Sequence, residues 1–209
     1  MRFNSAQIQK IGKEIRGKVD GKTLFDEFSR GRYSTDASVY QIKPLGVVLP
    51  KDTNDVLSLM EYSQKNSVPL LARGGGSSQC GQTVGESVVL DYSKHQNKIL
   101  ELNVEEKYVW VQPGVVLDHL NAYLKPHGLW FPVDVSTSSR ATIGGMSANN
   151  SCGSRSLYYG NMVHNVLAIE AILDDGSIFN FDQINKNYLA TKNNQDRLYK
   201  IIDKFIDVR

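Results

Sequence analysis

Several features that would define a protein class are scarce in this sequence. It has two cysteines, Cys80 and Cys152, which are too few for a disulfide scaffold and are not spaced as metal ligands. No uncharged run approaches the roughly 18 residues that a membrane-spanning helix needs, and the N-terminus has no apolar signal-peptide core. The 24 basic and 22 acidic residues give a net charge of +2 without a basic stripe, which argues against a dedicated nucleic-acid binder.

What remains is the composition of an ordinary globular protein. The chain of 209 residues is 41% hydrophobic and 22% charged, and it is long enough to bury a core without disulfides. We therefore expect a soluble, cytoplasmic protein, with peripheral attachment to the inner membrane as the alternative location.

Glycine is distributed unevenly along the chain. Nine of the 17 glycines lie in residues 73–86, the first glycine window, and residues 141–160, the second glycine window. Glycine gathers where the backbone turns sharply or approaches another group closely. Both windows are therefore candidate functional segments.

The pattern around the first window is typical of a βαβ unit. Short apolar runs at residues 45–49, 68–72 and 88–91 predict buried strands. Asp52 or Thr53 can cap a helix between the first two of them. The first window thus follows a predicted strand, and in α/β folds the loops at the carboxyl ends of parallel strands bind ligands.

Two hairpins are predicted in the second half of the chain. The apolar run at residues 99–102 is paired with 108–111 across a polar turn, and residues 166–173 are paired with 177–181 across the turn Asp-Asp-Gly. Between them, leucines recur at helical spacing up to Leu124, and Gly128 is the predicted stop signal.

Both ends of the chain show helical spacing. Isoleucines in residues 6–15 predict an N-terminal helix that packs on the rest, with a mobile leader as the alternative. Residues 198–206 predict an amphipathic helix that runs to the last residue without a stop signal, so we expect a fragment of a longer protein or an incomplete chain. The predicted divisions are an arm or helix over residues 1–37, one α+β subdomain over 38–97 and a second, C-terminally incomplete one over 98–209.

The first window has the composition of an anion-binding loop. Three successive glycines after a strand allow consecutive backbone N–H groups to point into one concavity, and hydroxyls and a guanidinium adjoin them. A P-loop requires Gly-Lys, whereas Gln82 follows Gly81; a dinucleotide fingerprint requires its third glycine where Gln79 stands. Both common nucleotide motifs are therefore absent, and a flexible surface turn is the bland alternative.

The second window, with the serines before it, is rich in small polar residues. Thr142 is placed to cap a short helix whose free N–H groups would face an anion. Gly144 and Gly145 would let a flat ring or a phosphate lie against the backbone, and Asn149 and Asn150 offer neutral donors that suit a polar ring edge better than a metal. A disordered loop is the alternative.

Four segments in the same order resemble one family. They are YSTDASVY from Tyr33, RGGGSSQCGQTVGE from Arg73, VQPGVVLDHLN from Val111 and STSSRATIGGMSANNSCGSRSLYYG from Ser136. They resemble the FAD-binding domain of the p-cresol methylhydroxylase and vanillyl-alcohol oxidase class, in its D-lactate, glycolate and D-2-hydroxyglutarate dehydrogenase branch. Within that branch they are most similar to the large bacterial members that carry a downstream iron–sulfur region. The likeness covers about residues 25–182.

This resemblance implies a fold and a binding site. The fold is α+β, with a small βαβ subdomain and a larger subdomain of mixed or antiparallel sheet flanked by helices. The first window would wrap the FAD pyrophosphate, and the second would line the ribityl chain, pyrophosphate and flavin edge. The implied cofactor-binding residues are Arg73, Gly74, Gly75, Gly76, Ser77, Ser78, Gln82, Pro113, Gly114, Thr142, Ile143, Gly144, Gly145, Ser147, Asn150, Gly153, Ser154, Gly160 and Val166, of which the last two would approach the adenosine end.

The resemblance also implies an activity. The enzyme would oxidise a D-2-hydroxy acid such as D-lactate, glycolate or D-2-hydroxyglutarate by hydride transfer to flavin N5. Ser77 stands where some relatives carry a histidine tether, so we expect non-covalent FAD, with Cys152 as an alternative tether. The family's substrate domain and the strand that completes its flavin domain have no counterpart here, so we expect most of an FAD site and little of the active site. No catalytic base is assigned, and a downstream iron–sulfur region is one candidate electron acceptor.

Two other functions stay open at this point. One is a different flavoenzyme with the same fold, such as the reductase of cell-wall precursor synthesis, although the run Asn149 to Gly153 favours the dehydrogenase branch. The other is a non-catalytic nucleotide-binding module. Of the histidines, His164 follows the second window and is the one candidate to approach the cofactor, whereas His119 lies in a helical pattern and is expected to be structural or exposed.

Overall fold

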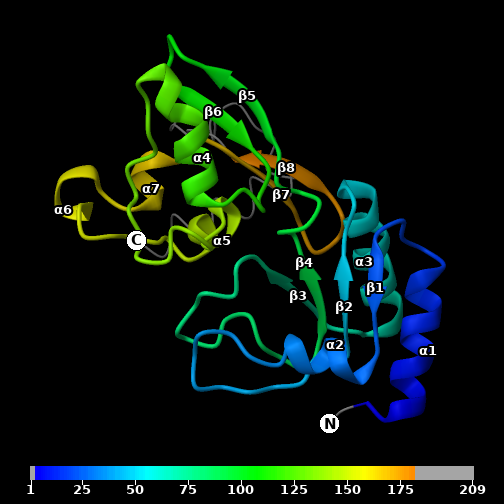
Figure 1. The fold of residues 1–209 in the computed structure, drawn as a ribbon. Coiled ribbons are helices and arrows are strands. Elements are labelled where there is room, and N and C mark those ends of the chain that lie inside the picture. The colour runs from blue at the N-terminus through cyan, green and yellow to red at the C-terminus, as the bar shows by residue number, and fades with distance from the viewer. Residues whose placement is uncertain (1–2, 182–209) are drawn as a thin grey trace, which may run out of the picture. The chain divides into compact units, whose positions relative to one another are not determined.

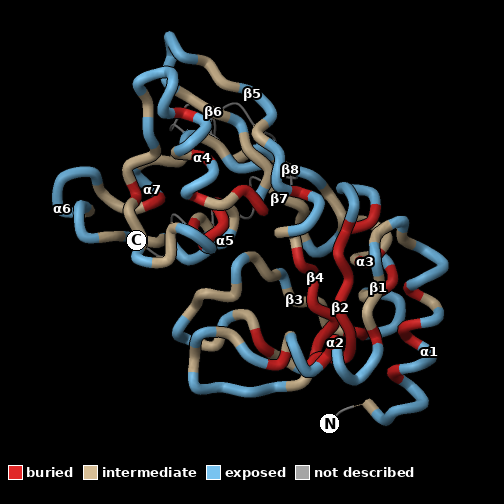
Figure 2. Tube along the Cα trace, in the orientation of Figure 1, coloured by how far each residue is buried: buried red, intermediate tan, exposed pale blue. Residues whose placement is uncertain are grey.

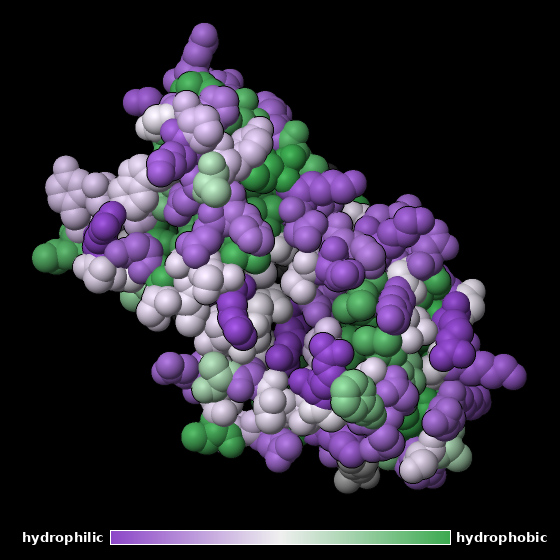
Figure 3. Space-filling view, viewed as in Figure 1, coloured by the Kyte–Doolittle hydropathy of each residue, from purple (hydrophilic) through white to green (hydrophobic). Residues whose placement is uncertain are grey.

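A computed structural model of the chain describes residues 3–181. The described residues divide into two compact units, one of residues 3–166 with 174–177 and the other of residues 167–173 with 178–181. Both candidate windows belong to the first unit. Within the described residues no helix combines the length and apolarity needed to cross a membrane, and the face seen in Figure 3 is largely hydrophilic.

The first unit contains a four-stranded sheet that carries the first window. Its strands are β1 (Lys22–Leu24), β2 (Gly46–Leu49), β3 (Leu70–Arg73) and β4 (Val88–Asp91), in the order β1-β2-β4-β3. β4 is parallel to both neighbours, and β1 is antiparallel to β2 (Figure 1). The two central strands are buried throughout (Figure 2), as expected from their continuous runs of Val and Leu.

Three helices accompany this sheet. α1 (Ser5–Arg16) buries its isoleucine face, and α3 (Thr53–Asn66) connects β2 to β3 and begins at the cap Asp52. These confirm the predicted N-terminal helix and the predicted crossover helix. β1 and α2 (Glu27–Arg32) lie in the stretch expected to be an arm and were not anticipated. The proposed subdomain limits at residues 37 and 97 stay predictions.

The second half of the first unit combines one hairpin with short helices. β5 (Ile99–Asn103) and β6 (Tyr108–Val111) pair antiparallel, as predicted. α4 (Leu117–Leu124) is followed by the 3-10 turn η1 (Lys125–His127), and Gly128 ends that turn with φ of +68°. α4 packs its leucines into a core with Val133, Ile143 and Met146. The remaining helices are α5 (Ile143–Ala148), α6 (Ser156–Tyr159) and α7 (Met162–Asn165).

The second unit contains a hairpin of β7 (Ile169–Ile172) and β8 (Ile178–Phe181), which pair antiparallel. The predicted hairpin is confirmed, although its first strand begins at Ile169 rather than at Val166, which instead caps α7. The helix predicted for residues 198–206 lies outside the described residues.

Candidate functional site

The first glycine window leaves β3 with its backbone donors uncommitted. Within the described chain, no hydrogen bond starts from the backbone N–H groups of residues 74–79. Six consecutive free donors suit an acceptor with several oxygens, such as a diphosphate. The loop reverses through Gly76 and Gly81, whose φ values of +62° and +71° favour glycine.

The Arg73 side chain supports this loop by bonding to neighbouring backbone. Its guanidinium donates to the carbonyl oxygens of Thr35 at 2.9 Å and Thr83 at 3.2 Å, and lies 5.2 Å from the centre of the Tyr33 ring. A β-carbon on Gly76 would come within 2.5 Å of the same guanidinium. The side chain that we expected to add charge toward a phosphate is therefore directed to the loop's own supports.

The contacts that support the loop extend through Tyr33 to Asp91, at the end of β4. The Tyr33 hydroxyl donates to Asp91 at 2.6 Å, and Asp91 also accepts from the backbone and side chain of Ser93. Burial, together with this hydrogen bond to a carboxylate, raises the pKa of Tyr33. Tyr33 therefore keeps its proton as a donor to Asp91.

The two windows meet at Thr142. A β-carbon on Gly74 would lie 2.1 Å from the Thr142 hydroxyl oxygen, and one on Gly145 would lie 3.1 Å from the same atom. A β-carbon on Gly75 would lie 2.2 Å from the carbonyl oxygen of Arg140. Real β-carbons do not come that close to other atoms, so the contact requires glycine at positions 74 and 75. Segments about 70 residues apart in the sequence therefore form one junction.

The start of α5 differs from the prediction. Thr142 is the N-cap, as expected, and its hydroxyl accepts from the Gly145 N–H at 3.4 Å. However, the N–H of Ile143 donates to Val115 and that of Gly144 donates to Pro113. The expectation that free N–H groups at this helix start face an anion is wrong, because these donors are used to join α5 to the segment after β6. The same join explains Gly144, whose β-carbon would lie 2.5 Å from Pro113.

The rest of the second window is held by Asp134. Its carboxylate accepts from the Ser154 hydroxyl at 2.7 Å and from the Arg155 backbone N–H at 3.1 Å, and lies 3.6 Å from the Arg155 guanidinium. The Ser154 hydrogen bond and the Arg155 N–H lower the pKa of Asp134. A β-carbon on Gly153 would lie 2.2 Å from Asp134, so the turn at residues 153–155 is fitted against this carboxylate.

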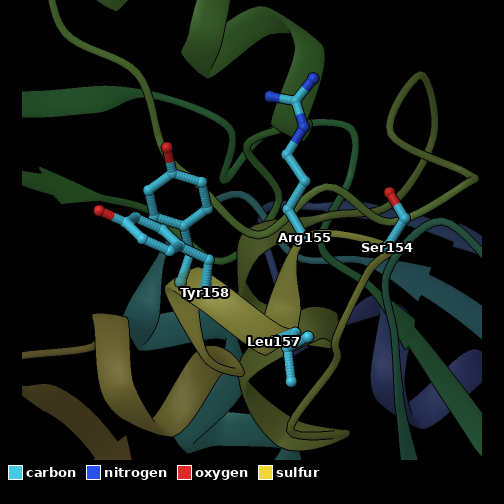
Figure 4. Close-up of a pocket in the computed structure, with 5 residues that line it drawn as sticks. Ser154, Arg155, Leu157 and Tyr158 are labelled. Atoms are coloured by element: carbon cyan, nitrogen blue, oxygen red, sulfur yellow. The ribbon is translucent and has the colours of Figure 1, made fainter.

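A surface pocket of about 440 Å³ lies beside this turn. Figure 4 shows Ser154, Arg155 and Tyr158 pointing to one side, whereas Leu157 points to the other. The Arg155 guanidinium lies 5.3 Å from the centre of the Trp130 ring, and the Trp130 and Tyr159 rings meet edge to face. The pocket wall is thus aromatic and cationic, which suits a planar or anionic group.

The remaining predicted residues serve the local structure in several ways. Gly114 is buried, and its N–H donates to Gln96, while the Ser147 hydroxyl donates to the carbonyl of Ile143. Asn150, with φ of +46°, accepts from the N–H of Val163. Ser77 makes no hydrogen bond within the described chain, and Gln82 takes Ser78 and Asn149 as partners.

His164, the candidate to approach the cofactor, forms part of a helix cap. The Nδ1 atom of His164 accepts from the Asn161 N–H and completes the cap of α7, close against Gly160, which has φ of +75°. His95 and His119 are exposed. In the described part of the chain, no group of three or more His, Cys, Asp or Glu side chains is placed to hold a metal.

Several residues at this site carry no sequence signal. Tyr33, Asp91 and Asp134 act as braces through contacts over 20 to 58 positions, and Arg140 contributes only a carbonyl. Such long-range pairs leave no periodicity or motif. The exception is Tyr33, which begins one of the four segments that carry the family resemblance.

The donor set fits a flavin dinucleotide. Residues 73–85 and 136–160 contain three arginines and no carboxylate side chain, and Glu86 is the one carboxylate in the sequences of the two windows. The windows themselves therefore bring little negative charge to an anion. The free N–H groups, the hydroxyls and the closely packed glycine backbone are the groups that bind a diphosphate in other nucleotide sites.

Comparison with known proteins decides the family. A model of the FAD binding domain family matches residues 44–182. The chain belongs to this family. Its cofactor is accordingly FAD, and its fold is the α+β FAD-binding fold of the p-cresol methylhydroxylase type, as the resemblance implied.

Two relatives and one solved structure illustrate the similarity. The D-2-hydroxyglutarate dehydrogenase of Haemophilus influenzae is 42% identical over 155 residues, which are 73% of this chain and 15% of that protein. The glycolate oxidase subunit GlcD of Bacillus subtilis is 37% identical, over 82% of this chain and 37% of that protein. Among solved structures, BBE-like 1 of Physcomitrella patens superposes with a TM-score of 0.71 at 21% identity, over 85% of this chain and 39% of that one. The chain thus spans a minor part of the proteins that it matches.

Proposed function

We propose that this chain is the FAD-binding part of a flavin-dependent dehydrogenase that oxidises a D-2-hydroxy acid. Its similarity to a D-2-hydroxyglutarate dehydrogenase and to a glycolate oxidase subunit supports this class of substrate. The observation that carries the proposal is the junction of the two windows at Thr142, with free backbone donors beside it. D-2-hydroxyglutarate, glycolate and D-lactate are the candidate substrates.

In this proposal the first window binds the diphosphate bridge. The N–H groups of residues 74–79 donate to phosphate oxygens, with the hydroxyls of Ser77 and Ser78 beside them. Hydrogen bonds to charged acceptors are about twice as strong as neutral ones, and the glycines allow the backbone to approach without side chains between. Arg73 keeps the loop open by holding it from behind, rather than by pairing with a phosphate.

The second window places the flavin end and the adenosine end. Pro113 and Gly114 lie against the cofactor, residues from Thr142 to Ser154 line its middle, and Gly160 and Val166 approach the adenosine. When bound, the flavin supplies the hydride acceptor at N5. The described residues orient it, and no base for the substrate hydroxyl is assigned among them.

We further propose that FAD is held without a covalent bond, because Ser77 stands where a histidine tether would be. Acid precipitation tests this: all of the flavin is expected in the supernatant, and flavin that stays with the protein would point to Cys152 as the tether. A cytoplasmic location and a downstream iron–sulfur electron acceptor complete the proposal.

The decisive experiment uses the protein purified with all the polypeptide that its gene encodes. An absorbance band near ~450 nm is expected for oxidised flavin, and it should bleach on anaerobic addition of D-2-hydroxyglutarate, D-lactate or glycolate. L-2-hydroxyglutarate and L-lactate are the matched controls for the two chiral acids. A band that no D-2-hydroxy acid bleaches would refute the substrate class and favour a different flavoenzyme, and absence of the band would favour a non-catalytic module.

A further inference from the structure

A second contact joins the two windows at a distance from Thr142. The side-chain amide of Gln82 donates through Nε2 to Asn149 Oδ1 at 3.0 Å. In the described part of the chain this is the one hydrogen bond that links the first window to the second. The two partners are 67 positions apart, so the contact comes from the fold and not from chain proximity.

Gln82 is fixed on its other side as well. Its Oε1 atom accepts from the Ser78 hydroxyl at 2.6 Å, and Ser78 in turn accepts from the Cys80 N–H at 3.2 Å. Asn149 continues the series by donating to Ser151 at 3.4 Å. Both amides are therefore oriented by their neighbours, and each has its oxygen and nitrogen assigned a different partner.

The Thr142 and Asn149 contacts form a frame, in which two points of the first window, Gly74 and Gln82, are fixed to the two ends of α5. At one end of α5, Thr142 packs against Gly74, and at the other end Asn149 bonds to Gln82. The six residues of α5 lie between, a length of about 9 Å at 1.5 Å per residue. On the opposite side of this frame, the N–H groups of residues 76–79 have no partner within the described chain.

The two ends of the frame differ in strength. The Thr142 contact is buried packing between glycine backbone and a cap residue, whereas Gln82 and Asn149 are both exposed. A neutral hydrogen bond in contact with water contributes little to stability and breaks readily. The Thr142 end is therefore the more firmly held of the two, and the Gln82 end is the more easily broken.

We propose that Gln82 and Asn149 form a clasp that closes the cofactor cradle and controls the rates at which FAD enters and leaves. They are positioning residues, because they act through each other and through Ser78 rather than on the reacting atoms. This inference depends on the proposed FAD site at the two windows. Because the contact joins the two windows across the proposed cradle, breaking it should speed both entry and exit.

A double-mutant cycle tests the clasp. Gln82→Ala, Asn149→Ala and the double variant are compared with the unsubstituted chain by stopped-flow flavin fluorescence, which measures FAD association, and by displacement, which measures dissociation. Each single variant is expected to raise both rate constants by about 3- to 10-fold, the range of one neutral hydrogen bond. The double variant should match the single ones, because either substitution already breaks the contact.

The control is Gln41→Ala, which removes an exposed glutamine outside both windows that has no side-chain partner in the described chain. It should leave both rates unchanged. A rise in dissociation alone would mean that Gln82 binds FAD directly, and additive effects or unchanged rates would likewise overturn the clasp. If the unsubstituted chain binds no FAD, the proposed site and the clasp both fail, whereas binding with unaltered rates in the variants refutes the clasp alone.

Discussion

The approach of the Gly75 backbone to the Arg140 carbonyl gives the most specific prediction. Gly75 faces the Arg140 carbonyl so closely that an alanine β-carbon would lie 2.2 Å from its oxygen, where at least 3.0 Å is needed. Gly75→Ala therefore forces the windows apart by about 0.8 Å, the difference between these two values. The effect is steric only, since Gly75 does not have a positive φ. Overpacking of this kind costs about 1–3 kcal/mol of folding stability.

The same displacement weakens cofactor binding. Moving the loop by this amount stretches hydrogen bonds of about 2.9 Å beyond the favourable range. Loss of one hydrogen bond to a charged phosphate costs about 1.5–3 kcal/mol, which is at least about tenfold in Kd. We expect both effects in Gly75→Ala, measured by urea unfolding and by titration of FAD fluorescence.

Two glycine substitutions serve as controls. A β-carbon on Gly85, in the same window, would lie no closer than 3.6 Å to any other atom, and one on Gly31, in α2, would have no atom within 4 Å. Gly85→Ala should leave stability and FAD affinity near those of the unsubstituted chain, and Gly31→Ala should gain about 0.5–1 kcal/mol from helix propensity. The steric account fails if Gly75→Ala behaves like Gly85→Ala in both assays.

Three further substitutions test hydrogen bonds to carboxylates in the first unit. Asp55→Ala removes a buried carboxylate that accepts three backbone N–H groups, so urea unfolding should show a loss of about 3 kcal/mol; a loss below about 1 kcal/mol would refute its structural role. Tyr33→Phe removes the hydroxyl that donates to buried Asp91, and the free energy of unfolding should fall by about 1.5–3 kcal/mol. An unchanged midpoint of urea unfolding would contradict this. Because hydrogen bonds lower the pKa of Asp134 below its ordinary 3.8, its carboxylate stabilises the fold above that value, and this contribution is lost as pH falls through the lowered pKa. Asp134→Asn should therefore flatten the acid side of the stability curve, and an unaltered curve would count against the brace at Ser154.

The regular elements followed from local patterns. Continuous Val and Leu runs predicted β2 and β4, because a parallel strand covered on both faces needs no polar alternation. The turn Asp-Asp-Gly predicted the β7–β8 hairpin, and the side chains of Asp52 and Thr142 predicted two helix starts. In each case, the residues that specify the element lie within it or next to it.

The missed features depend on contacts between distant residues. β1 has three residues, Lys22–Leu24, and no apolar pattern of its own. It is a strand because it pairs with β2. The donors at the start of α5 looked free because the carbonyls of Pro113 and Val115 that accept from them come from another segment. Likewise, the sequence shows that Arg73 is charged, but only the fold shows that its charge is directed to Thr35 and Thr83.

The most direct test of the account follows the backbone amides themselves. In nitrogen–proton correlation spectra of the chain, adding FAD should shift the N–H signals of residues 74–79 downfield and slow their exchange with solvent, together with signals from residues 142–154. Riboflavin, which lacks the diphosphate, should leave the signals of residues 74–79 in place. If FAD binds and these six signals do not move, the two windows are not the cradle of the diphosphate.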